Sequence, residues 1–399
     1  MKNLQLPGVM YISLDGMMEP LGYSQVFKYL EELSSDYKIT LVSFEKFHDL
    51  ANSEALNLLI HDCSKHEIDW VRLKYRNGYM GLGQLANIVS LICLPIYIFL
   101  KCNIKIVHIR SYMPGIGIPM LSALFNFKLI FDMRGFWADE KHDRLGWKKK
   151  SLKYRFFKQL ESYLIRRSDS IITLTNVSKE IIYDVFKKNE SEIKVIPTCV
   201  DSHEFTRKHH IKDDNKIIIG YLGSVDTAYD FQKFLFFIKQ IKMHTPIPLE
   251  LRVLTNKNKE IIEEILIQSD IKNIDLVVKF VLREMLPSEI SKFDFLGFCL
   301  KENYSINASM PTKIAEALAC GVPIVCNAFN KDIKNLIETE GIGFIHNFTS
   351  ELTSQDCIAI IELIKDSTMH KKCSEIAKNQ FSLESGVLKY KSIYSQLTS

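Results

Sequence analysis

The stretch DFLGFCLKENYSINASMPTKIAEALACGVPIVCN (residues 294–327) decides the fold class, because two strand-like runs flank a single helix in it. Apolar runs at 294–300 and 323–327 predict buried strands. Between them, Pro311 marks the start of a helix that runs through Ala319 and ends at Gly321. This order is typical of a βαβ unit, in which parallel strands are covered by helices.

Similar apolar runs recur on both sides of this stretch, with helical segments between nearly all of them. In the second half of the chain they lie at 216–222, 248–254, 276–282 and 343–346. In the first half they lie at 9–15, 37–44, 67–74, 104–111, 128–134, 169–175 and 193–197. The alternation predicts an α/β protein made of two Rossmann-like domains, whose parallel sheets face each other across a cleft.

A chain of 399 residues suits two domains of roughly 200 residues each. The polar segment DSHEFTRKHHIKDDN (201–215) has no apolar periodicity and is the best candidate for a linker. We therefore expect an N-terminal domain over 1–203 and a C-terminal domain over 204–379. A last helix, at about 380–399, is expected to pack back on the first domain.

Composition excludes several classes of protein. With 47% hydrophobic and 25% charged residues and a mean hydropathy near zero, the chain is neither disordered nor a multi-span membrane protein. Its net charge of +4 does not argue for nucleic-acid binding. Nine scattered cysteines without a Cys-x-x-Cys pair, and a start without a secretion signal, predict a cytoplasmic protein with reduced thiols. Neither an Asp-x-Asp motif nor a His/Cys cluster is present, so no metal site is predicted.

The helix that starts at Pro311 is the best candidate for a binding site. Backbone N–H groups in its first turn, around Thr312, can receive phosphate oxygens, and Lys313 adds a positive charge. Glu316 lies one turn further on the same face and can accept two hydrogen bonds from a ribose diol. The pattern alone leaves an exposed Lys–Glu pair on an ordinary helix equally open.

The run PTKIAEALACGVPIV (311–325) resembles the nucleotide-sugar segment of retaining family 4 glycosyltransferases, which have the GT-B fold. The family motif has two glutamates separated by seven residues ahead of an Ala-Cys-Gly-x-Pro turn. Glu316 matches the second glutamate, which the resemblance implies binds the ribose, and Ala308 stands at the first. Pro311, Thr312 and Lys313 resemble a subgroup variant with its lysine near the diphosphate.

Further blocks are similar to bacterial cell-surface polysaccharide glycosyltransferases, and they follow the same order. They are YISLDGMMEPLGYSQVFKYLEEL (11–33), ITLVSFEK (39–46), FDMRGFWADE (131–140), VIPTCVD (195–201) and GYLGS (220–224). The resemblance implies that the loop containing Gly16 and Gly22 lies against the diphosphate and the acceptor. It places Gly223 and Ser224 near the diphosphate, and Arg283 at the base. From the residues alone, the first loop is equally well a plain turn capped by Ser24.

Three residues are candidates for the chemistry. Arg134 stands where many family members carry a histidine, and as a fixed cation it suits a phosphate, an acceptor carboxylate or a sugar. A brace to Asp132 or Asp139 is equally open. Asp139 and Glu140 are candidates to contact the acceptor hydroxyl, although such pairs are more often solvated. His108 and Arg110, at the end of a strand, are lesser candidates.

The resemblance implies an enzyme that moves a sugar from a nucleotide diphosphate donor to a hydroxyl of a saccharide or lipid-linked saccharide. Configuration would be retained, in surface polysaccharide or lipopolysaccharide synthesis, with the first domain on the acceptor side. The nucleotide sugar is the donor substrate, and neither a further cofactor nor a metal is expected. Two alternatives stay open, a nucleotide-sugar 2-epimerase and an inactive assembly scaffold of the same fold.

Two segments bear on contact with a membrane. Residues 85–100 (LANIVSLICLPIYIFL) are apolar but short, interrupted by Pro95, so a buried or interfacial helix fits better than a transmembrane one. Residues 148–158 (KKKSLKYRFFK) carry six basic side chains among aromatic ones. They suit either anionic lipid or solvent. We expect a cytoplasmic protein without a nucleic-acid partner. Peripheral contact with the cytoplasmic face of the inner membrane is left open.

Overall fold

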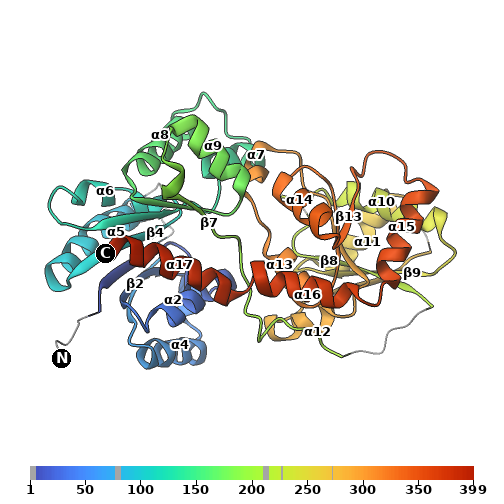
Figure 1. Ribbon diagram of the computed structural model, residues 1–399, viewed down its shortest axis with the longest axis horizontal. Coiled ribbons are helices and arrows are strands. Elements are labelled where there is room, and N and C mark those ends of the chain that lie inside the picture. The colour runs from blue at the N-terminus through green and yellow to red at the C-terminus, as the bar shows by residue number, and fades with distance from the viewer. Residues whose placement is uncertain (1–5, 77–81, 210–214, 226–227, 272) are drawn as a thin grey trace. The chain divides into compact units, whose positions relative to one another are not determined.

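The computed structural model describes residues 6–76, 82–209, 215–225, 228–271 and 273–399. It divides into two compact units. The first consists of Met1–Pro197 together with Gly386–Ser399, and the second of Thr198–Ser385. Each unit contains a parallel sheet with helices packed on it (Figure 1). The predicted Rossmann-like architecture is therefore confirmed for each unit.

The first unit is built on a seven-stranded parallel sheet with the order β3-β2-β1-β4-β5-β6-β7. Its strands are β1 (Gly8–Ser13), β2 (Lys38–Glu45), β3 (Asp69–Lys74), β4 (Ile104–Arg110), β5 (Lys128–Asp132), β6 (Ser170–Thr173) and β7 (Ile193–Val195). In the central strands, Val9 pairs with Ile39 on one side and with Ile106 on the other, and all three are buried. Because both faces are covered, these strands are continuous apolar runs, which is why they were predictable.

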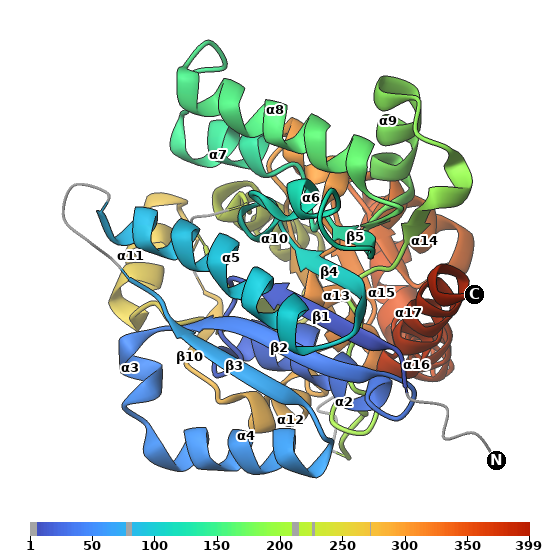
Figure 2. The ribbon, with the colours of Figure 1, turned by 90° about the vertical axis from the view of Figure 1, so that its left-hand side faces the viewer.

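Helices cover both faces of this sheet. They are α1 (Pro20–Gly22), α2 (Lys28–Leu33), α3 (Phe47–Leu50), α4 (Ser53–Lys65), α5 (Leu82–Lys101), α6 (Ile118–Leu121), α7 (Trp137–Leu145), α8 (Leu152–Arg167) and α9 (Asn176–Phe186). The strand order reverses after β3, so right-handed crossovers place the connections before and after it on opposite faces. Figure 2 shows α5, α6 and α8 on one face, with α2 and α4 on the other. The helix expected over 85–100 is confirmed, and it continues through Pro95.

The last helix, α17 (Leu383–Thr398), completes the first unit. Tyr394 is fully buried, and its hydroxyl lies 2.7 Å from Nδ1 of His108. Tyr390 donates a hydrogen bond of 3.2 Å to Asp132. Burial lowers the pKa of His108, which favours a neutral imidazole under this helix. His108, a lesser site candidate, is thus part of the core.

The second unit is built on a six-stranded parallel sheet with the order β10-β9-β8-β11-β12-β13. Its strands are β8 (Ile217–Leu222), β9 (Leu249–Leu254), β10 (Asp275–Lys279), β11 (Phe295–Phe298), β12 (Ile324–Cys326) and β13 (Gly343–Ile345). Its helices are α10 (Phe231–His244), α11 (Lys259–Gln268), α12 (Leu286–Ile290), α13 (Thr312–Ala319), α14 (Lys331–Glu340), α15 (Ser354–Lys365) and α16 (Met369–Gln380). The predicted strands of both units agree with these bounds to within three residues.

The segment predicted as a linker is packed into the second unit over residues 201–209, and 210–214 lie outside the described residues. Phe205 is 1% exposed, and its N–H donates to the carbonyl of Asp201 at 2.8 Å. The N–H of Lys208 donates to Oγ of Ser291 at 2.9 Å. A single buried aromatic side chain thus anchors a stretch that has no apolar periodicity.

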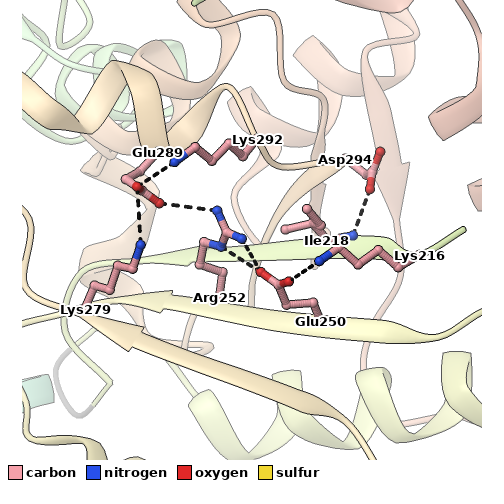
Figure 3. A network of polar contacts seen from close by, with 8 residues as sticks. All are labelled: Lys216, Ile218, Glu250, Arg252, Lys279, Glu289, Lys292 and Asp294. Carbon is pink, nitrogen blue, oxygen red and sulfur yellow. Dashed lines mark hydrogen bonds and ion pairs between the residues drawn. The ribbon is translucent and has the colours of Figure 1, made fainter. Parts of the chain in front are cut away.

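Charged side chains link β9 and β10 to α12 in the second unit (Figure 3). Arg252 bridges the carboxylates of Glu250 and Glu289. Three lysines complete the network: Lys216 lies 2.7 Å from Glu250, and Lys292 and Lys279 lie 2.7 and 3.4 Å from Glu289. Burial raises the pKa of both carboxyl groups, but the surrounding cations outweigh it and lower both pKa values.

Candidate functional site

The loop before α13 is held by two side chains from distant parts of the second unit. Oγ1 of Thr198 donates a hydrogen bond of 2.8 Å to the carbonyl of Met310. Nδ2 of Asn330 donates to the carbonyls of Ile306 and Ser309, both at 2.8 Å. Thr198 and Asn330 are buried. These bonds fix the start of α13, where Pro311 is the N-cap residue and Thr312 the first helical residue.

Lys313 is buried in the first turn of α13, so the alternative of an exposed Lys–Glu pair is wrong. Among the described residues, its Nζ has no hydrogen-bond partner. The ammonium instead lies 3.6 Å from the ring centroid of Tyr229, 5.0 Å from that of Tyr221 and 5.3 Å from that of Phe298. Burial lowers the pKa of Lys313 to about 7, against the opposing effect of Glu316.

The loop after β8 lies beside this lysine. Gly223 has a φ of +107°, which side chains rarely adopt, and a Cβ there would lie 3.5 Å from Nζ of Lys313. The hydroxyl of Tyr221 donates to the carbonyl of Ser224 at 2.7 Å and holds the turn. The structure therefore places the turn at Gly223 beside Lys313, and the contact of Gly223, Ser224 and Lys313 with a diphosphate stays a prediction.

Glu316 is buried one turn after Lys313. Nη1 of Arg283 lies 3.9 Å from its Oε1, and Arg283 also pairs with Glu204, from Nε to Oε1, at 2.9 Å. The guanidinium lies 5.0 Å from the ring centroid of Phe205. Burial raises the pKa of Glu316, while Arg283 and Lys313 act against it. The sequence offers no signal for Glu204 and Phe205, which fall in the stretch interpreted as a linker.

These parts make a coherent binding arrangement. A helix N-terminus directs N–H groups and a partial positive charge outward, which favours an anion. Lys313 adds a buried cation beside a turn that has no side chain at Gly223. Glu316 offers a carboxylate one turn away. A ligand with an anionic group near Lys313 and a vicinal diol near Glu316, one helical turn away, matches this arrangement.

In the first unit, the loop after β1 is closed by protein groups. The N–H groups of Met17 and Met18 donate to the carboxylate of Glu45, at 2.9 and 3.3 Å. A Cβ at Gly22 would lie 1.9 Å from the carbonyl oxygen of Gly16, so close packing explains Gly22. Ser24 caps no N-terminus, because its Oγ donates to the carbonyl of Pro20. The role of Gly16 and Gly22 in binding stays a prediction.

Arg134 follows β5 in the left-handed region, with a φ of 59°. Its Nη1 lies 3.6 Å from Oδ1 of the buried Asp132, and Nη1 of Arg110 lies 3.3 Å from Oδ2. Burial raises the pKa of Asp132, but Arg134, His108 and Arg110 hold it well below its usual range. Arg134 thus makes the contact with Asp132 that one of the two interpretations of this residue predicts. Its role in the chemistry stays a prediction.

Asp139 and Glu140 have internal partners. Asp139 is buried, and its two oxygens accept from the hydroxyl of Tyr154 at 2.6 Å and from Nζ of Lys158 at 2.9 Å. Glu140 pairs with Arg144 one turn later on α7, at 2.8 Å. These contacts support a bracing role for Asp139, and we leave it out of the proposed site. Among the described residues, no group of three or more His, Cys, Asp or Glu side chains could hold a metal ion.

Two family models together match residues 28–380 of the chain. Residues 28–204 match the model of Glycosyltransferase Family 4, and residues 202–380 match that of Glycosyl transferases group 1. The chain is a glycosyltransferase of the GT-B type. No curated protein matches the sequence of this glycosyltransferase.

Solved structures share the fold of the glycosyltransferase over nearly its whole length. A glycosyltransferase from Rickettsia africae has a TM-score of 0.68 at 14% identity and covers 99% of both chains. Sucrose-phosphate synthase from Thermosynechococcus elongatus has a TM-score of 0.67 at 14% identity, and the match covers 98% of this chain and 99% of that chain. HepE from Anabaena, in complex with UDP, has a TM-score of 0.65 at 12% identity, and the match covers 98% of this chain and 100% of that chain. At these identities the likeness shows the fold alone.

Proposed function

We propose that this glycosyltransferase moves a sugar from a nucleotide diphosphate donor to a hydroxyl of a saccharide or lipid-linked saccharide. The donor is held at the start of α13, and the reaction retains configuration and serves surface polysaccharide synthesis. The observation that carries the proposal is the ammonium of Lys313, which is buried without a hydrogen-bond partner among the described residues.

A buried cation without a hydrogen-bond partner among the described residues is costly, and the fall of the pKa of Lys313 to about 7 reflects that cost. A diphosphate beside Gly223 would supply the missing negative charge and accept hydrogen bonds from the first turn of α13. The same contacts would stabilise the diphosphate as it leaves, because charge increases on it during transfer. Lys313 is therefore the main leaving-group stabiliser in this proposal.

Glu316 would accept hydrogen bonds from the ribose of the same donor, one turn from the phosphates. The Arg283–Glu204 pair stands next to Glu316 and would border the base. The fold neighbour HepE, solved with UDP and with UDP-glucose, supports a nucleotide sugar as donor. Retention and the polysaccharide pathway rest on the sequence resemblance alone.

A donor screen tests the proposal directly. The purified protein is incubated with UDP-, GDP-, ADP- and CMP-linked sugars, with and without inner-membrane lipid extract, and release of the nucleotide is measured. Nucleoside diphosphate release that requires the extract is the expected result. Conversion of the nucleotide sugar without any acceptor would indicate the epimerase alternative. Failure to bind any nucleotide by calorimetry would indicate the scaffold and overturn the proposal.

A further inference from the structure

The exposed side chains of α5 are apolar from Leu85 to Leu100. Among the described residues, the segment Gly83–Lys101 is the one helix long and apolar enough to cross a membrane, and 28% of it is buried. Asn87, Leu91 and Ile98 face inward and are buried. The exposed large apolar side chains recur every three to five residues, at Leu85, Val89, Ile92, Tyr97 and Leu100. This is a helix with a packed inner stripe and an unpartnered apolar outer stripe.

The apolar surface continues beyond α5. The connection over residues 113–127 has no charged residue, and it exposes Met120 and, at 74%, Leu124. A Cβ at Gly117 would meet Ile92 of α5 at 3.1 Å, and one at Gly115 would meet Leu164 of α8 at 2.6 Å. The connection is therefore packed against both helices, and Figure 2 shows them on the same face of the sheet.

The α7–α8 hairpin adds positive charge to this surface. It exposes Leu145, Leu152 at 84%, and Phe156. Among them stand exposed basic side chains, at Lys148, Lys149, Lys150, Lys153, Arg155, Arg166 and Arg167. The one acidic residue between 148 and 167 is Glu161, which is buried. A basic fringe beside exposed apolar side chains is the pattern of a surface that binds anionic lipid.

The α5 helix lies in this layer and does not span a membrane. It connects β3 to β4, and both strands are hydrogen-bonded into the same sheet. Asn87 on its inner face also exchanges two hydrogen bonds of 3.2 Å with the backbone of Arg76. To cross a bilayer, the helix would have to leave the sheet and expose these groups to hydrocarbon.

We propose that α5, the 113–127 connection and the α7–α8 hairpin form a docking surface for an anionic lipid bilayer. We call it the lipid face. A second copy of the chain is the less favoured occupant, because a symmetric dimer through this face would bring the basic fringes of both copies together. A negatively charged membrane complements both the apolar stripe and the fringe. The proposal does not depend on the donor site.

The test is flotation with vesicles of phosphatidylcholine alone or with added phosphatidylglycerol. We expect the protein to float with the anionic vesicles and far less with the neutral ones. The double variant Val89→Glu/Tyr97→Glu should lower partitioning at least tenfold, since it places charges in the apolar stripe. Partitioning should also fall in the triple variant Lys148→Ser/Lys149→Ser/Lys150→Ser. The partitioning that this variant retains should no longer depend on the salt concentration. Leu58→Glu, on exposed α4 of the opposite face, is the matched control and should not change it.

Three outcomes would overturn the proposal. One is a wild-type protein that floats with neither kind of vesicle. Another is equal loss of flotation in Leu58→Glu and in the α5 variant. The third is a wild-type protein that sediments as a dimer while the α5 variant sediments as a monomer, with equal flotation of the two. That result would assign the face to a second copy of the chain. Nucleotide binding of each variant, measured in parallel, separates this question from that of the donor site.

Discussion

The ammonium of Lys313 lies 3.6 Å from the ring centroid of Tyr229, with its pKa lowered to about 7 by burial. A bound diphosphate favours the charged form and raises this pKa. Binding of a nucleotide sugar above pH 7 should therefore take up close to one proton, and affinity should fall as pH rises. A nucleotide sugar suits the test because its diphosphate has no group that titrates near neutrality.

Calorimetry in buffers of different ionisation enthalpy measures that proton uptake. Lys313→Met should abolish the uptake and weaken binding, whereas Lys371→Met, on an exposed lysine of α16, should change neither. The same shift predicts that the folded protein gains stability between pH 7 and the ordinary value of 10.5, because the unfolded chain then binds more protons. A binding enthalpy that is equal in all buffers would refute the assignment of Lys313 to the phosphates.

Glu316→Ala should weaken nucleotide binding by about 10- to 100-fold, which is the usual effect of losing hydrogen bonds to a charged group. The fold should persist, because burial raises the pKa of this carboxyl, and its ion pair with Arg283 is long at 3.9 Å. Calorimetry gives the affinity, and circular dichroism melting gives the fold. Glu338→Ala, on the exposed face of α14, is the control. Unchanged affinity in Glu316→Ala would remove the ribose from this position.

Gly22→Ala should destabilise the first unit by about 1–3 kcal/mol, because the new methyl group would overlap the carbonyl of Gly16. Urea unfolding is the measurement. Gly146→Ala provides the comparison, since a Cβ there meets nothing within 4 Å and adds only the strain of a φ of +67°. If Gly22→Ala kept full stability but lost donor binding, the loop would serve a ligand and not its own packing.

Asp139→Asn should cost about 2 kcal/mol of unfolding free energy, because Lys158 and Tyr154 lose hydrogen bonds to a charged group. We expect little change in nucleotide release per folded molecule. Denaturant titration and turnover, measured on the same preparation, separate the two effects. A variant with normal stability and lost turnover would return Asp139 to the catalytic candidates.

The network of Figure 3 predicts how acid acts on the second unit. The pKa values of Glu250 and Glu289 are lowered from 4.5 in the folded protein, so their stabilisation is present above that value and is lost as pH falls through the folded values. Glu250→Gln should therefore flatten the dependence of stability on pH in this acid range. Glu302→Gln, on an exposed carboxyl, should leave the dependence steep.

The strands and the start of α13 could be predicted, because both leave local patterns. Buried parallel strands read as short apolar runs, and Pro311 with Gly321 brackets a helix. The supports of the site could not be predicted, because each joins positions far apart in sequence. Asn330 holds carbonyls at 306 and 309, and Glu45 holds the N–H groups of the first loop. The packing of residues 201–209 into the second unit could not be predicted, because a single buried aromatic residue, Phe205, leaves no periodicity.

The return of α17 to the first unit has a consequence for the order in which the protein matures on the ribosome. Tyr390 and Tyr394 fill the space above His108 and Asp132, and they are made after the entire second unit. Until α17 has left the ribosome, His108 and Asp132 lack these two partners, so the N-terminal sheet completes its packing only after the second unit has been synthesised. The two units are therefore completed together at the end of synthesis, and not one after the other.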